Sequence, residues 1–187
     1  VRFVGEPLVA VVAESLAMAR DAAAAVQVEI EPLPANVDPL RALQPGAPVL
    51  WADAPDNIAA ETRYGDAAAA EAAFARAAHR VALELVNQRL APSPLEPRSV
   101  LAWIAGGRLV VRLSSQGPTG IRSGLADTLP GLAADDIRVR VGDVGGGFGM
   151  KLALYPEDVV VAHAARTLAR PVKWQAERLE DFLSAVH

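Results

Sequence analysis

The sequence predicts an α+β, or mixed α/β, fold in two pieces. Segments with apolar residues at a period of two alternate with segments at helical spacing along the 187 residues. Two adjacent glycines, Gly106 and Gly107, separate two strand-like segments, which is a pattern typical of an antiparallel hairpin. Five prolines between residues 34 and 60 predict an extended connector, and we place a domain boundary there.

The first piece is predicted to be a strand, a helix and a second strand. Residues 1–12 are rich in valine and predict a strand with a break at Gly5-Glu6-Pro7. The alanine-rich residues 14–27 place Leu16 and Val26 at helical spacing. Residues 26–33 return to a period of two and predict the second strand, which Pro32 and Pro34 end.

The second piece begins with a predicted helix over residues 65–80, with Asp66 as its cap. The segments that follow are predicted in chain order as a strand at 81–90, hairpin strands at 99–105 and 108–113, a helix at 117–129, a strand at 136–141, a helix at 155–169 and a strand at 170–174. Prolines near the first turns of the last two helices support both assignments.

Composition excludes several classes of function. The formal net charge of −4 and the 5% of aromatic residues argue against a nucleic-acid-binding surface. The absence of cysteine excludes disulfides, zinc–thiolate sites and cysteine-ligated iron–sulfur clusters from this chain. No apolar run is long enough to span a membrane. His79, His163 and His187 are too scattered to form a metal site, and neither end carries a start or stop signal, so we expect a piece of a longer chain.

The segment DVGGGFGMK, residues 143–151, is the strongest functional signal. Four glycines in the five positions 145–149 surround Phe148 and leave backbone amides open to anions or other acceptors. The segment is not a Walker loop, because Met150 precedes Lys151 and Leu152 follows it, nor a dinucleotide fingerprint, because Met150 stands where a glycine is needed. A strained turn without a ligand is the alternative.

Two further residues have both a structural and a functional interpretation. Gln116 follows a predicted strand and precedes Gly117-Pro118, so it either fixes a loop or presents its carboxamide at a cleft. Glu96, in the segment LEPRS, is interpreted as structural: it pairs with Arg98 or orders a turn between prolines.

Taken together, these segments resemble the large, molybdopterin-binding subunit of the molybdenum hydroxylases, the family of xanthine dehydrogenase, aldehyde oxidase and aerobic carbon monoxide dehydrogenase. The resemblance covers nearly the whole chain and depends on the order of six segments, namely VRFVGEPLVAVVAE with VEIEPLPANVDP, GDAAAAEAAFARAAHRVALEL, NQRLAPSPLEPRSVLA, SSQGP, DVGGGFGMK and RPVKWQAERLEDFLSAVH. It implies that residues 1–60 are the C-terminal part of an α/β hammerhead domain with its proline-rich connector. Residues 61–187 would then be the first part of the molybdenum-cofactor-binding domain.

The resemblance also implies the site and its chemistry. Gln116 would reach an oxygen ligand of the molybdenum as the catalytic residue. The residues lining the cofactor would be Gln116, Gly117, Gly145, Gly146, Gly147, Phe148 and Gly149, with no direct metal ligand from this chain. The implied cofactor is molybdenum–molybdopterin in its cytosine dinucleotide form. The implied reaction is hydroxylation of an aldehyde or N-heterocycle with water-derived oxygen, or oxidation of carbon monoxide.

The same resemblance sets the context of the chain. It implies a cytoplasmic enzyme in which the remainder of the large subunit, an iron–sulfur subunit and a flavin subunit carrying FAD complete a dimer of heterotrimers. The general base of the family lies outside these residues, and Leu152 stands where xanthine-type members have a substrate-binding Glu, which disfavours a purine. The competing interpretations are a non-redox module that binds a nucleotide or anion, and a fragment that is inert by itself.

Overall fold

The structure is a computed structural model that describes residues 1–186, so His187 lies outside it. Contacts between Cα atoms divide it into two units, one formed by Val1–Gln27 with the described residues from Arg89 onward and the other by Val28–Gln88. Every buried residue of the described chain lies between Pro94 and Ser184. The packed core is therefore confined to this part of the first unit.

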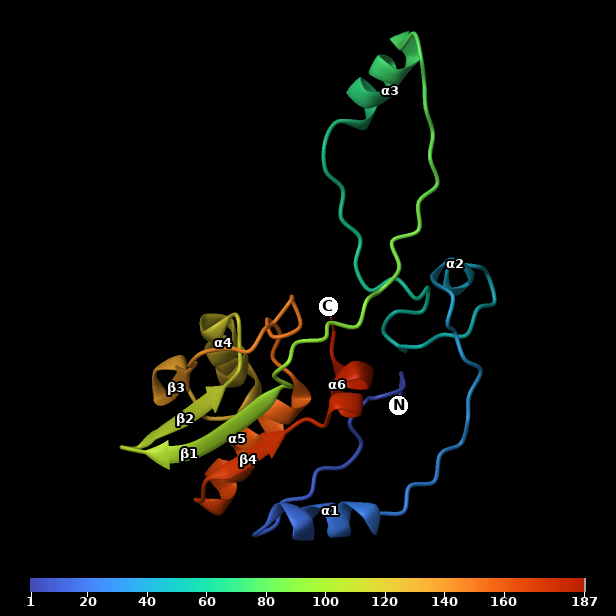
Figure 1. Ribbon diagram of the computed structural model, residues 1–187. Coiled ribbons are helices and arrows are strands. Elements are labelled where there is room, and N and C mark those ends of the chain that lie inside the picture. Colours follow the sequence, from blue (N-terminus) through green and yellow to red (C-terminus); the bar gives the residue numbers. More distant parts are fainter. Residues whose placement is uncertain (187) are drawn as a thin grey trace. The chain divides into compact units, whose positions relative to one another are not determined.

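A four-stranded mixed sheet in the order β3-β2-β1-β4 forms the centre of the first unit (Figure 1). Its strands are β1 (Ser99–Ala105), β2 (Arg108–Leu113), β3 (Ile137–Arg140) and β4 (Val172–Gln175). β1 is antiparallel to both β2 and β4, whereas β2 and β3 are parallel. Gly106 and Gly107 both adopt positive φ in the tight turn between β1 and β2, which confirms the predicted hairpin.

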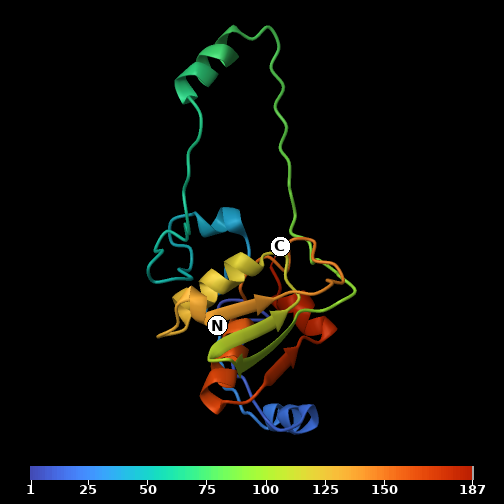
Figure 2. The same ribbon diagram turned by 90° about the vertical axis from the view of Figure 1, so that its left-hand side faces the viewer.

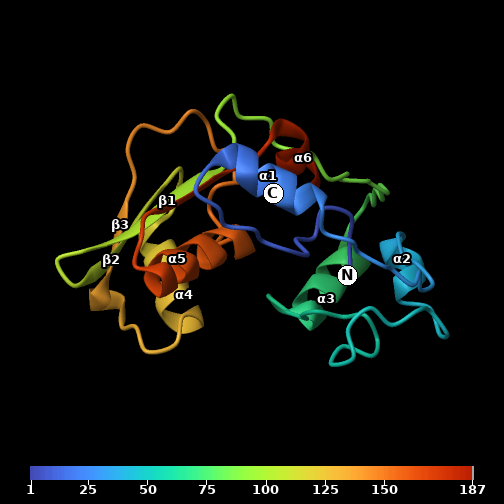
Figure 3. The same cartoon turned by 90° about the horizontal axis from the view of Figure 1, so that it is seen from below.

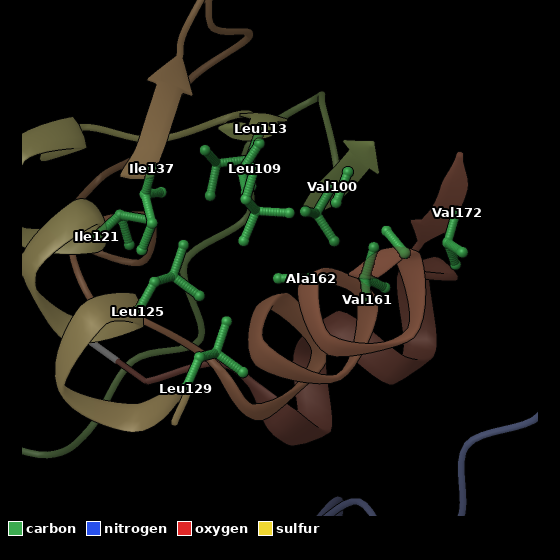
Figure 4. Close-up of a cluster of buried hydrophobic side chains, with 13 residues drawn as sticks. Val100, Leu109, Leu113, Ile121, Leu125, Leu129, Ile137, Val161, Ala162 and Val172 are labelled. Atoms are coloured by element: carbon green, nitrogen blue, oxygen red, sulfur yellow. The ribbon is translucent and has the colours of Figure 1, made fainter. Parts of the chain in front are cut away.

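Two helices cover one face of this sheet. They are α4 (Pro118–Thr128), which connects β2 to β3, and α5 (Pro156–Leu168), which connects β3 to β4. Ile121 and Leu125 of α4 and Val161 of α5 pack against apolar side chains of the strands, which alternate toward the helices (Figure 4). Seen from below, α4 and α5 lie on the same side of the sheet (Figure 3). The other face is covered by neither helix.

Helix ends follow local sequence signals. Pro118 and Pro156 occupy the first turns of α4 and α5, as predicted. α1 (Leu16–Ala24) is capped by the Ser15 side chain, which accepts a hydrogen bond from the N–H of Met18 at 3.2 Å. After β4 the chain forms α6 (Arg178–Ser184), which the sequence analysis did not predict.

The second unit contains little regular structure. Its helices are α2 (Pro39–Ala42), within the proline-rich connector, and α3 (Ala67–Arg76), between two long extended stretches (Figure 2). The Asp66 side chain caps α3 by accepting from the N–H of Ala69 at 2.9 Å, which confirms the predicted helix and its cap. No residue from 28 to 88 is buried.

Three predicted strands are wrong. Residues 1–12, 26–33 and 81–90 form no strand, although their valines and leucines alternate. A strand is stabilised by hydrogen bonds to a neighbouring strand, and none of these segments pairs with another described residue. The apolar side chains of these segments are not buried against another element: Val28 is 50% exposed and Val81 is 84% exposed.

Candidate functional site

The parallel pairing of β2 and β3 brings the two sequence-predicted parts of the site together. Gln116 follows the carboxyl end of β2, and the glycine loop, residues 143–151, follows the carboxyl end of β3. Carboxyl ends of parallel strands lie at the same edge of a sheet, which is a common position for a ligand cleft. β1 is antiparallel to β2, so Glu96, just before β1, lies at this edge as well.

Gln116 and the glycine loop are in direct contact. The N–H of Gln116 donates to the carbonyl of Lys151 at 2.9 Å, and the side-chain Oε1 of Gln116 accepts from the N–H of Lys151 at 3.2 Å. The second bond uses the oxygen of the carboxamide, so the Nε2 group is left as a donor. Gln116 itself is exposed. Its side chain is thus held by a hydrogen bond through Oε1, and within residues 1–186 its N–H₂ group donates to no other residue.

The glycines are required where they lie. A Cβ placed on Gly147 would overlap the Gln116 carboxamide, and a Cβ on Gly145 would overlap Cβ of Glu96. Gly146 has a φ of +94°, which side chains rarely adopt. Phe148 also has a positive φ, at 47°, a conformation that is unusual for a large residue and indicates a backbone held by its surroundings.

The loop presents hydrogen-bond donors. Within the described chain, the N–H groups of Gly146, Gly147, Phe148 and Gly149 donate to no other residue, whereas the loop on either side is bonded. Successive unpaired amides of this kind form a concave site for anions or other acceptors. Phe148 is 66% exposed beside these amides, so it is not part of the hydrophobic core.

Glu96 anchors the loop, a role that the sequence analysis missed. Its Oε2 accepts from the N–H of Gly145 at 2.7 Å, from the Ser114 hydroxyl at 2.7 Å and from Nζ of Lys151 at 3.0 Å. Burial acts to raise the pKa of Glu96, but these hydrogen bonds and the charge of Lys151 together hold the pKa below its usual value. The predicted pairing with Arg98 is wrong, because the partner cation is Lys151, from a distant part of the sequence.

Lys151 is buried and faces inward from the loop. Its Nζ donates to the backbone carbonyl of Glu96 at 2.8 Å as well as to the carboxylate. A buried ammonium needs such partners because its desolvation is costly. Lys151 therefore fastens the end of the glycine loop to the segment before β1. The only sequence signal for this role was the position of a Lys directly after GGFGM.

Arg98 fastens the same edge to α6. The Nε of Arg98 donates to Asp181 at 2.8 Å, and an NH2 group donates to the Ser184 hydroxyl at 2.6 Å. The guanidinium lies 3.8 Å from the ring centroid of Tyr155, whose hydroxyl donates to the carbonyl of Met150 at 2.6 Å. Burial would lower the pKa of Arg98, but Glu157 and Asp181 raise it. The loop is thus held on a rigid base.

Known proteins resemble this chain in sequence and in fold. Residues 50–187 match the model of the family described as molybdopterin cofactor-binding domain. The chain belongs to this family. The resemblance to large subunits of molybdenum hydroxylases, predicted from six sequence segments, is confirmed by the relatives.

One such relative is the nicotine 6-hydroxylase large subunit of Paenarthrobacter nicotinovorans, which is 38% identical over 100% of this chain and 23% of its own length. The carbon monoxide dehydrogenase large chain of Hydrogenophaga pseudoflava is 34% identical over 97% of this chain and 24% of its own length. Among solved structures, quinoline 2-oxidoreductase from Pseudomonas putida 86 matches with a TM-score of 0.80 and 36% identity over 94% of this chain and 22% of that chain. The chain thus spans about a quarter of the length of these relatives.

Proposed function

We propose that the chain forms one wall of a molybdenum–pterin site in an oxidoreductase that hydroxylates an N-heterocycle or an aldehyde. The observation that carries the proposal is the convergence of the Gln116 carboxamide and the unpaired amides of Gly146–Gly149 at one edge of the sheet. When bound, the cofactor supplies two-electron oxidation coupled to transfer of a water-derived oxygen. The residues of this chain bind and orient it.

The donors at this edge suit an anionic, oxygen-rich group. Among the described residues the Nε2 donor of Gln116 has no acceptor, and the loop adds consecutive N–H groups. The carboxylate nearest to them, that of Glu96, already accepts from three donors, so it contributes little repulsion toward an incoming anion. Gly117 and Gly145 flank this surface, and we assign them to its lining. The absent Cβ atoms allow close approach, and Phe148 shields the site from water.

Several finer assignments accompany this proposal. We infer a cytosine dinucleotide form of the cofactor, a partial hammerhead domain over residues 1–60 and the cofactor-binding portion from residue 61. We also infer cytoplasmic location and a dimer of heterotrimers with iron–sulfur and flavin subunits. None of the helices within residues 1–186 is long and apolar enough to cross a membrane. The names of two relatives, a nicotine hydroxylase and a quinoline oxidoreductase, favour an N-heterocycle.

Leu152 supports a substrate other than a purine. It is 56% exposed, and Gly117, next to Gln116, lies against its side chain and carbonyl. An apolar side chain here cannot accept or donate hydrogen bonds to a purine, whereas it can contact an apolar ring.

The test is metal and pterin analysis of the complete large subunit with its partners. We expect stoichiometric molybdenum and a pterin dinucleotide. Gln116→Ala should retain both and lower kcat by about 10- to 100-fold, the equivalent of a lost hydrogen bond to a charged group. Gln175→Ala, the same change at the exposed end of β4, is the control and should leave kcat unchanged. Absence of molybdenum, with tight binding of a simple nucleotide instead, would favour the non-redox module.

A further inference from the structure

The face of the sheet that α4 and α5 leave open is strongly basic. Side chains alternate along a strand, so the positions opposite the core are fixed by the register. Their basic members, all exposed, are Arg108, Arg112, Arg138, Arg140 and Lys173. No Asp or Glu occupies any strand position on this face. We call it the basic face, and it contrasts with the net charge of −4 of the whole chain.

The centre of the basic face is apolar. Trp103 of β1 lies opposite Val110 of β2, and Val110 lies opposite Arg138 of β3. Val110 is only 3% exposed although no helix covers it, because its neighbours across the sheet screen it. Leu101 and Trp103 are half-buried. An apolar centre with a charged rim is the usual anatomy of a protein–protein interface, in which Trp and Arg are enriched.

The arginines of the basic face have no anionic partners among residues 1–186. Within residues 1–186, none of the five basic side chains makes an ion pair, whereas Arg98 and Lys151 at the site edge are fully paired. A hollow at the β3 edge of the sheet is lined by Arg108 and Arg138, by Arg122 of α4 and by one carboxylate, that of Asp135 just before β3. The Nε of Arg122 is buried and has no hydrogen-bond partner in the described chain. Unsatisfied guanidinium groups favour a partner that brings carboxylates.

We propose that the basic face is an internal docking surface for an acidic segment of the same large subunit, outside residues 1–187. A second copy of the chain is disfavoured, because a two-fold contact would place arginines against arginines. The relatives are about four times longer than this chain, so most of a large subunit is available to cover the face. A covalently linked segment also has a high effective concentration. The proposal does not depend on the cofactor and can be tested without it.

Zero-length cross-linking tests this proposal directly. Lys151 and Lys173 are the only lysines of the chain, and Lys151 is buried against Glu96, so carbodiimide acts on one native amine of the face. Arg112→Lys in the complete subunit adds a second amine to the face, on β2. Arg76→Lys, at the exposed end of α3, is the matched control. Mixing isotope-labelled and unlabelled subunits separates cross-links within one chain from those between copies.

We expect Lys173 and the introduced amine to join Asp or Glu residues of the same polypeptide outside residues 1–187, and the control amine to join none of those residues. Phenylglyoxal should modify Arg112 and Arg140 at least about tenfold more slowly than Arg76, as expected for groups held in an interface. Cross-links to another subunit or to a second copy would overturn the proposal. The proposal would also be overturned if no cross-links formed and phenylglyoxal modified Arg112 and Arg140 as fast as Arg76, because the basic face would then be open to solvent.

Discussion

At the scale of single residues, the site depends on a close fit between a glycine and a glutamine. Gly147 does not adopt positive φ, so its backbone would accept a side chain, but a Cβ there would overlap the Gln116 carboxamide. Both residues are therefore coupled. A side chain at position 147 fits only if Gln116 is displaced or shortened, and this coupling can be measured independently of any cofactor.

Gly147→Ala should lower the free energy of unfolding by about 1–3 kcal/mol, the usual cost of overpacking. The cost should disappear when Gln116→Ala is present as well, because the overlapping atoms are then gone. Gly142→Ala, whose Cβ would meet only Arg112 NH2 at 3.6 Å, is the control. Urea unfolding of the native chain, the two single variants and the double variant measures the coupling. If Gly147→Ala lowered the free energy of unfolding equally with and without Gln116→Ala, the overlap would be contradicted.

Glu96 acts through the residues that it orients. Glu96→Ala removes the anion beside buried Lys151 and an acceptor for the Gly145 N–H. We therefore expect the free energy of unfolding to fall by about 2–3 kcal/mol, less than for a fully buried ion pair because the carboxylate is partly exposed. Glu96→Gln keeps an acceptor, so its free energy of unfolding should fall less than that of Glu96→Ala. Denaturant unfolding checks the order of the variants. Because the pKa of folded Glu96 is lowered, its contribution is present at neutral pH and is lost as the pH falls through that pKa.

At the scale of elements, the start of α5 carries a carboxyl group with an unusual pKa. Asp158 is buried and accepts from the N–H of Tyr155 at 3.1 Å. Burial raises its pKa from 3.8 to about 6, more than the Tyr155 hydrogen bond and the charge of Arg98 lower it. The folded state thus favours protonated Asp158. Its contribution to stability is complete below about pH 4 and is lost as the pH rises through 6.

Asp158→Asn removes this titration and keeps an acceptor for Tyr155. We expect the stability of the native chain relative to this variant to fall by about 2–3 kcal/mol between pH 4 and pH 7, from a shift of about two pKa units. Chemical denaturation at a series of pH values gives the difference. Asp127→Asn, at an exposed position of α4, is the control. Parallel pH profiles for the native chain and Asp158→Asn would show that Asp158 does not titrate in this range.

At the scale of the whole molecule, stability is distributed unevenly. All buried residues of the part that the structure describes lie between Pro94 and Ser184, and none lies in residues 28–88. Local opening is easiest where few apolar contacts form. Brief trypsin treatment should therefore cut first after Arg63, Arg76 or Arg80, and mass spectrometry should recover a fragment containing β1 to α6. First cuts after Arg112 or Arg138 would contradict this distribution.

The sequence by itself determined helices α1, α3, α4 and α5, the hairpin, the glycine loop and the family. Helical spacing, caps such as Asp66 and turn glycines such as Gly106 act between near neighbours, so they are readable from short segments. The same local reasoning failed for residues 1–12, 26–33 and 81–90, because alternation indicates a strand only where a partner strand is present.

Only the tertiary structure decided how the site is assembled. The parallel pairing of β2 with β3 places Gln116 against Gly147, and the folding of the loop brings Lys151 to Glu96 rather than leaving Glu96 with Arg98. Helix α6 likewise depends on Arg98 reaching Asp181 across the sequence. Such contacts join residues that share no local pattern, and strand order and register are set by the packing of the whole core. The chemical roles open to these residues could therefore be predicted from the sequence, whereas the contacts that bring them together could not.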